Sequence, residues 1–302
     1  MRFDDSPVDT SQLEDRRGGS GAGRGLAIGG GGAGIIGVVV YLLVTLIGGG
    51  GGDAGTDGTG GTGEGTGREA LPASEIASRC ATAGAVDQYD DCLVLKVFNE
   101  VNEVWTAEFQ RTGQTRTGQT YAPPTLVYFD DAVSTGCGTA SAEVGPFYCP
   151  PDQRVFIDLG FLSELQERYG AQGRYAQAYI VAHEVGHHLQ TITGTEERLR
   201  QAQQADPSRE NELSVQLELQ ADCYAGVWST LANRGGNVTI TETDLDEALG
   251  AAEAVGDDRI QASAGAGVDP ESWTHGSAEQ RRTSFLTGYR GATMEACGTV
   301  PA

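Results

Sequence analysis

The stretch Ala182-His183-Glu184-Val185-Gly186-His187-His188-Leu189-Gln190 carries the strongest information on fold and chemistry in this sequence. His183 and His187 stand four residues apart, so on an α-helix both imidazole rings project from one face. Two neutral imidazoles in this arrangement can bind one Zn²⁺ ion, with Glu184 beside the metal as a general base. His188 is turned by about a further 100° around the helix, which keeps it away from the same ion.

A third metal ligand has to come from elsewhere in the chain, because a catalytic zinc site uses three protein ligands and an open position for water. The extended pattern H-E-x-x-H-x-x-G-x-x-H fails here, since Gln190 and Thr193 occupy its Gly and third His positions. Glu218 and Asp222 offer an alternative, because they share one face of an otherwise apolar helix. We expect Glu218 to bind the metal and Asp222 to accept a hydrogen bond from the outer N–H of His183.

These residues together predict a hydrolytic site that acts on peptide bonds. A bound zinc ion lowers the pKa of a water molecule toward about 7 and polarises a carbonyl group. Glu184 would take the proton of that water and deliver it to the leaving amine. His275 could stabilise the oxyanion; the alternative for His275 is a structural histidine that caps the helix after it.

The overall charge excludes one class of partner. The 302 residues carry a net charge of −22 with a pI of about 4.4, whereas nucleic-acid binding needs clustered Lys and Arg. The acidity indicates a well-solvated surface, or alternatively an acidic cleft that prefers basic peptides.

The cysteines indicate disulfides rather than a metal cluster. There are six, and none of them forms a C-x-x-C pair or has zinc-ribbon spacing. An even number suits an oxidising compartment outside the cytoplasm. We expect the pairs Cys80–Cys92, Cys137–Cys149 and Cys223–Cys297, although six cysteines allow 15 connectivities.

Composition divides the chain into four parts. Residues 1–25 are polar and contain arginines, 26–47 are apolar and reach the roughly 20 residues that a membrane span needs, 48–69 are rich in Gly and Thr, and 70–302 have a globular composition. Arginines before the apolar run and acidic residues after it predict a single-pass membrane helix with a cytoplasmic N-terminus. The run 48–69 predicts a flexible tether that leads to an extracytoplasmic domain. A cleaved signal peptide is the alternative for the apolar run.

Periodicity predicts an α+β fold that is mostly helical and zincin-like, with a small sheet or hairpin before the metal-binding helix. Helices are expected at 91–109, 161–169, 175–191, 211–231 and 242–255, the last being the one helix expected in the Ala- and Gly-rich tail 237–302. A strand is expected at 125–129, and a hairpin is expected from 146–149 and 154–157.

With these motifs in place, the chain resembles the neutral zinc metallopeptidase family of bacterial membrane-anchored proteins. The resemblance rests on five blocks that cover nearly the whole chain: 13–18 (LEDRRG), 145–150 (GPFYCP), 182–190, 218–228 and 275–281. It implies a gluzincin-like fold and zinc dependence, with His183, His187 and Glu218 as ligands and Glu184 as the catalytic residue.

The interpretation is therefore a membrane-tethered zinc endopeptidase that acts outside the cytoplasm. One alternative is a disulfide-stapled binding or scaffold domain that holds zinc without turnover. The other is a zinc amidohydrolase that acts on cell-wall peptides with the same ligands.

Overall fold

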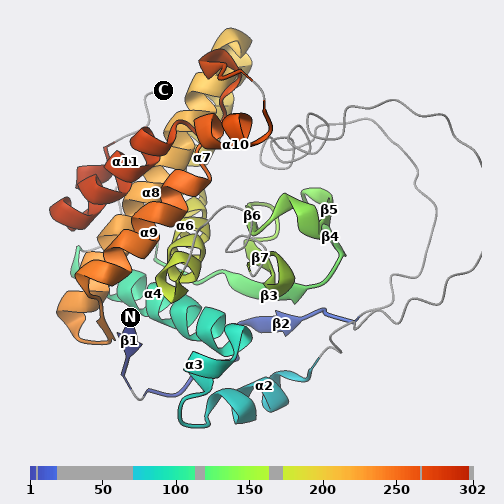
Figure 1. Cartoon of the computed structure of the whole chain (residues 1–302), viewed down its shortest axis with the longest axis vertical. Coiled ribbons are helices and arrows are strands. Elements are labelled where there is room, and N and C mark those ends of the chain that lie inside the picture. The colour runs from blue at the N-terminus through green and yellow to red at the C-terminus, as the bar shows by residue number, and fades with distance from the viewer. Residues whose placement is uncertain (5, 19–70, 113–119, 163–172, 266, 299–302) are drawn as a thin grey trace, which may run out of the picture.

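The structure, a computed structural model, describes residues 1–4, 6–18, 71–112, 120–162, 173–265 and 267–298. It is an α+β fold dominated by helices, as predicted (Figure 1). The long helices stand together on one side of the molecule, and the small sheets lie beside them. The expected membrane helix at 26–47, the tether at 48–69 and most of the expected helix at 161–169 lie outside the described residues.

The predicted helices at 91–109, 175–191, 211–231 and 242–255 are present, whereas the helices at 73–80, 85–88 and 195–205 were not predicted. The α-helices are α2 (Ala73–Cys80), α3 (Ala85–Gln88), α4 (Asp90–Arg111), α6 (Arg174–Ile192), α7 (Thr195–Ala205), α8 (Glu210–Gly235), α9 (Glu242–Ala254), α10 (Asp257–Ser263) and α11 (Ala278–Gly291). Short 3-10 helices are η1 (Ala142–Val144), η2 (Pro207–Arg209), η3 (Pro270–Ser272) and η4 (Met294–Cys297). No helix among the described residues combines the length and apolar character that crossing a membrane requires.

A four-stranded sheet lies against the helices in the order β2-β3-β7-β6. Its strands are β2 (Leu13–Asp15), β3 (Thr125–Phe129), β6 (Phe147–Cys149) and β7 (Arg154–Asp158). β2, β3 and β7 run parallel, and β6 returns antiparallel to β7 as the predicted hairpin. β6 is therefore the edge strand on the side of α6, and among the described residues no further strand pairs with it.

The tail contains more helix than we predicted, because α10 and α11 follow α9. α11 packs against α8 at very short range through glycines. A Cβ atom on Gly288 would lie 1.8 Å from the carbonyl oxygen of Cys223, and one on Gly226 would lie 2.0 Å from that of Phe285. Gly, Arg and Thr give α11 little apolar periodicity, so the expectation of a single helix in the tail was wrong.

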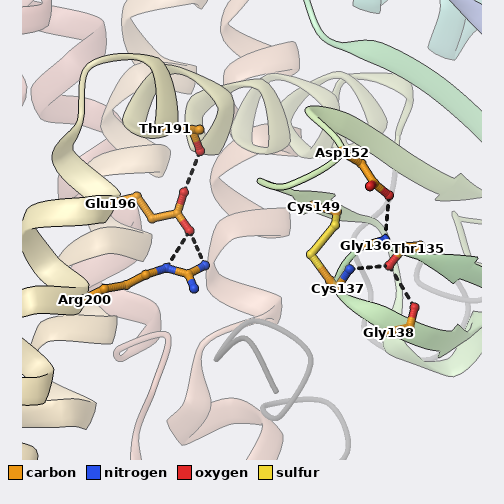
Figure 2. The surroundings of a disulfide bond; sticks show 9 residues. All are labelled: Thr135, Gly136, Cys137, Gly138, Cys149, Asp152, Thr191, Glu196 and Arg200. Atoms are coloured by element: carbon orange, nitrogen blue, oxygen red, sulfur yellow. Dashed lines mark hydrogen bonds and ion pairs between the residues drawn. A yellow bond between two sulfur atoms is a disulfide. The ribbon is translucent and has the colours of Figure 1, made fainter. Parts of the chain in front are cut away.

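All three predicted disulfides are present: Cys80–Cys92, Cys137–Cys149 and Cys223–Cys297. The second one ties a small hairpin of β4 (Ala132–Thr135) and β5 (Gly138–Ser141) to the end of β6 (Figure 2). Asp152 reinforces this link, because its carboxylate accepts a hydrogen bond of 2.8 Å from the backbone N–H of Gly136.

The described residues 1–4 and 6–18 pair with strands of the folded domain, while the expected cytoplasmic location of residues 1–25 stays a prediction. β1 (Arg2–Phe3) pairs antiparallel with β8 (Val238–Thr239), and β2 pairs parallel with β3. We call the described residues 1–4 and 6–18 the N-terminal segment. Strands of two and three residues show too few alternations to be recognised in a polar sequence.

Candidate metal centre

Helices α6 and α8 carry the candidate metal ligands and approach closely where those ligands lie. Gly186 stands between the two ligand histidines, and a Cβ atom there would lie 3.1 Å from the Cα and carbonyl oxygen of Ala221 on α8. This glycine therefore packs directly against the second metal helix. A side chain at this point would push Glu218 away from the histidines.

The structure brings His183, His187 and Glu218 together. The two Nε2 atoms are 3.1 Å apart, His183 Nε2 lies 3.2 Å from Glu218 Oε2, and His187 Nε2 lies 3.5 Å from Glu218 Oε1. A tetrahedral zinc ion with bonds of about 2.0–2.1 Å separates its ligand atoms by about 3.3 Å. The ligand atoms therefore have the spacing that one tetrahedral ion requires.

The outer ring nitrogens identify which atoms are free to bind a metal. His183 Nδ1 lies 2.8 Å from Asp222 Oδ1, and His187 Nδ1 lies 2.8 Å from Gln190 Oε1. Both partners accept, so in the neutral rings both Nδ1 atoms carry the proton. Two bare Nε2 lone pairs and a carboxylate oxygen then converge, which is repulsive unless a cation lies between them. The donor set fits Zn²⁺.

A second group of candidate ligands does not fit a metal. Cys80, Asp91 and Cys92 are close together, but the two sulfur atoms form a disulfide and offer no thiolate. Among the described residues this leaves the histidine and glutamate cluster as the candidate metal centre.

Asp222 is held by more partners than we predicted. Arg281 on α11 donates to both of its carboxylate oxygens, from Nε at 2.8 Å and from Nη2 at 2.9 Å, and the Tyr179 hydroxyl donates to Oδ1. Burial opposes the charge on Asp222, but Arg281 and His183 keep its pKa below the ordinary value. Asp222 therefore faces His183 as a carboxylate, the strongest kind of acceptor for the outer N–H of a ligand.

Gln190 holds the other ligand histidine in place. Its side-chain amide donates to the carbonyl oxygen of Leu217 at 2.7 Å and to Gln220 Oε1 at 3.2 Å. These bonds turn its carbonyl oxygen toward His187. From the sequence, Gln190 was noted only as a break in a longer histidine pattern, and the fixed offset of three residues from His187 was the available signal.

Glu184 lies buried beside the ligands, where β6 meets α6. Burial raises its pKa to about 8, against opposing effects from His183, Arg281 and the backbone of Tyr148 on β6. A divalent cation would favour its charged form. The carboxylate thus stands next to the metal position and next to the edge strand of the sheet.

His275 lies near the centre, and it does not cap the helix that follows it. Ser277 is the N-cap of α11, in a capping box with Gln280. The backbone N–H groups of residues 274–276 all donate to Asp257 Oδ2 at 2.7–3.0 Å, and His275 Nδ1 lies 3.1 Å from Asp257 Oδ1. Burial opposes the charge on Glu218, but the nearby histidines hold its pKa well below the usual range, and His275 is one of them.

His188 bonds to residues of the fold, and its ring nitrogens contact Ala122 and Tyr148. Its Nε2 donates to the carbonyl oxygen of Ala122 at 2.7 Å, so Nδ1 is the acceptor for the Tyr148 hydroxyl at 3.0 Å. Burial lowers the pKa of His188 to about 4, which keeps the ring neutral. The pair fixes β6 against α6 beside Glu184.

Two imidazoles and a carboxylate that converge beside a second buried carboxylate define a protein able to hold one metal ion. The chain matches, over residues 1–300, the family described as "Putative neutral zinc metallopeptidase", and it belongs to this family. Zinc is the metal that this family implies.

The names of two similar proteins describe no activity. The chain is 44% identical to "Uncharacterized protein YpfJ" of Escherichia coli (strain K12) over 199 residues, which are 65% of this chain and 67% of the relative. It is 40% identical to "Uncharacterized protein Rv2575" of Mycobacterium tuberculosis (strain ATCC 25618 / H37Rv) over 234 residues, 74% of this chain and 75% of the relative. No solved structure matches the chain.

Proposed function

We propose that the protein is a zinc-dependent endopeptidase that acts outside the cytoplasm, attached to a membrane. One observation carries the peptidase proposal: three ligand atoms converge at tetrahedral spacing, while both outer histidine nitrogens are held by acceptors. Three disulfides support an oxidising compartment. The charge-free run at 25–52 supports membrane attachment.

In this proposal His183, His187 and Glu218 hold the zinc ion. When bound, zinc lowers the pKa of a water molecule and polarises the scissile carbonyl group. Glu184 accepts the proton of the attacking water as the new C–O bond forms, and then delivers this proton to the nitrogen as the C–N bond breaks. The products are one carboxylic acid and one amine.

His275 is the proposed donor for the oxyanion. Asp257 holds its Nδ1 and the backbone around it, while Gly276 lies against α8, where a Cβ atom would be 3.1 Å from Val215. This loop therefore packs one turn before Glu218 on α8. A ring that carries both protons can donate from Nε2 to the developing negative charge.

The edge strand β6 is the proposed place for the substrate. An extended peptide can add to an open strand edge through main-chain hydrogen bonds. Tyr148 on β6 bonds to His188 and its backbone influences Glu184, so a peptide along this strand would pass beside the general base. The Cys137–Cys149 disulfide holds the end of the same strand.

The decisive experiment compares wild type with Glu184→Gln, with zinc analysis and digestion of a panel of denatured proteins. We expect one zinc per chain in both proteins and a fall in cleavage rate of about 10²–10⁴-fold in the variant. Zinc in both with no cleavage by wild type would favour the silent binding or scaffold domain. Cleavage of cell-wall peptides but of no protein would favour the amidohydrolase.

A further inference from the structure

The N-terminal segment is bonded to the point at which the described chain resumes after residue 70. Asp15 lies at the end of β2, and its Oδ2 accepts a hydrogen bond of 3.1 Å from the backbone N–H of Leu71. β2 pairs with β3 in register, Leu13 with Leu126 and Asp15 with Tyr128. The end of β2 and the start of the described chain at residue 71 therefore lie at one place.

A buried ion pair closes this junction. Arg17 is 3% exposed and donates to Asp15 from Nε at 2.8 Å and from Nη2 at 2.5 Å. Its Nη1 lies 3.6 Å from Asp91 on α4, and its guanidinium lies over the ring of Tyr128 at 5.2 Å. An arginine is buried in this way only where its charge is met on each side.

The contacts continue along α4 toward the start of the chain. Lys96 is 2% exposed, and its Nζ lies 2.9 Å from Asp4 Oδ1 and 3.0 Å from the carbonyl oxygen of Ser6. Asn99 exchanges two hydrogen bonds with the backbone of Asp9, at 2.7 and 3.0 Å. The segment is thus paired at its strands and along its length.

We propose that the N-terminal segment and residues 71–298 lie on the same side of any membrane that the protein meets. These hydrogen bonds and ion pairs cannot form across a hydrocarbon layer of about 30 Å. A single crossing between residues 18 and 71 would separate the two parts, so the expected arrangement with a cytoplasmic N-terminus and an extracytoplasmic domain is replaced. The proposal is independent of catalysis.

Cysteine labelling in intact cells tests this sidedness on the full chain. Pro7→Cys and Ala262→Cys place single thiols at exposed positions in the two parts, and the six paired native cysteines make the parent protein an unlabelled control. A membrane-impermeant maleimide is applied before and after permeabilisation. For each position we take the ratio of labelling before permeabilisation to labelling after it. We expect these two ratios to agree within about twofold. Labelling of one position in intact cells and of the other only after permeabilisation would overturn the proposal.

Two neighbouring arginines give a second, purified-protein test. Arg16 pairs with Glu14 at 2.7 Å but is 30% exposed, so Arg16→Gln is the matched control for Arg17→Gln. Loss of the buried pair should lower the melting temperature by about 10 °C or more, whereas loss of the exposed pair should change it by about 2 °C or less. If Arg17→Gln fails to fold while Arg16→Gln folds, that result supports the proposal as a large drop in melting temperature would. Equal melting of both variants and the parent would show that the segment is not part of the domain.

Discussion

Two buried arginines make the same kind of bond in different parts of the molecule. Arg17 at the sheet and Arg281 behind the metal centre are each 3% exposed, and each donates to both oxygens of one aspartate. They differ in the other contacts that the aspartate makes. Asp15 also accepts from the backbone of Leu71, whereas Asp222 also holds His183.

This difference separates groups that hold the chain together from groups that hold a metal. Around Arg17 the charges are satisfied by the protein itself. Around Arg281 the polar contacts lead to ligand atoms that still require a cation. We therefore expect changes at the first cluster to reduce stability with little effect on zinc affinity, and changes at the second to reduce zinc affinity in addition to any loss of stability.

The largest effect that tests this comparison is expected from Glu218→Gln. The variant keeps the shape of the side chain but removes the anionic ligand, so zinc affinity should fall by far more than the about 10–100-fold loss typical of outer-sphere residues. The zinc-free protein should also lose some stability, because the neighbouring histidines favour the Glu218 carboxylate in the folded state, so zinc affinity is the deciding measurement. Competition with a chelator measures the affinity.

Glu212→Gln is the control on the same helix, since the Glu212 side chain is 54% exposed and contacts Arg209 and Gln216 at the surface. It should bind zinc as wild type does. Near-normal zinc affinity in Glu218→Gln would contradict the three-ligand site and, with it, the peptidase proposal.

The metal centre could be predicted from the sequence because both of its helices carry local patterns. His183 and His187, like Glu218 and Asp222, are four residues apart, and a helix then brings each pair to one face. The disulfides of residues 80–92 and 137–149 are equally local. These features need no knowledge of the rest of the fold.

The remaining features depend on contacts between distant parts of the chain. The strand β2 forms by pairing with β3, in which Leu13 lies opposite Leu126. A strand of three residues whose partner is this distant in sequence has no local pattern that predicts it. The role of Arg281 depends on α11, whose glycines conceal its helical periodicity but allow close packing on α8. Only the Ser277 and Gln280 capping box marked where that helix begins.

The next largest effect compares the two groups behind the ligand histidines. Asp222 is charged and Gln190 is neutral, so Asp222→Asn should weaken zinc binding by about 10–100-fold and Gln190→Met by about tenfold or less. Asp222→Asn should also lower the stability of the zinc-free protein, because Arg281 loses its carboxylate. Unfolding curves with and without zinc separate the two losses. Weaker zinc binding in Gln190→Met than in Asp222→Asn would reverse the proposed order.

The smallest effect concerns Asp257, which holds the loop of His275 and touches no metal ligand. Burial opposes its charge, but His275 and the backbone N–H groups of residues 274 and 275 keep the pKa of Asp257 below its ordinary value of 3.8. Its carboxylate therefore stabilises the fold above pH 3.8, and this contribution is lost as the pH falls through the lower, folded-state value. Asp257→Asn should cost about 1–3 kcal/mol near pH 7.

Urea unfolding between pH 3 and 7 measures this difference, with the exposed Asp246→Asn as the control. The free energies of unfolding of wild type and Asp257→Asn should approach each other as the pH falls below 3.8, while the control follows wild type throughout. A gap that stays constant with pH would mean that the Asp257 charge contributes nothing and that only the shape of the side chain matters. In that case Asp257 would differ from Asp15 and Asp222, since both of those bond to a buried arginine.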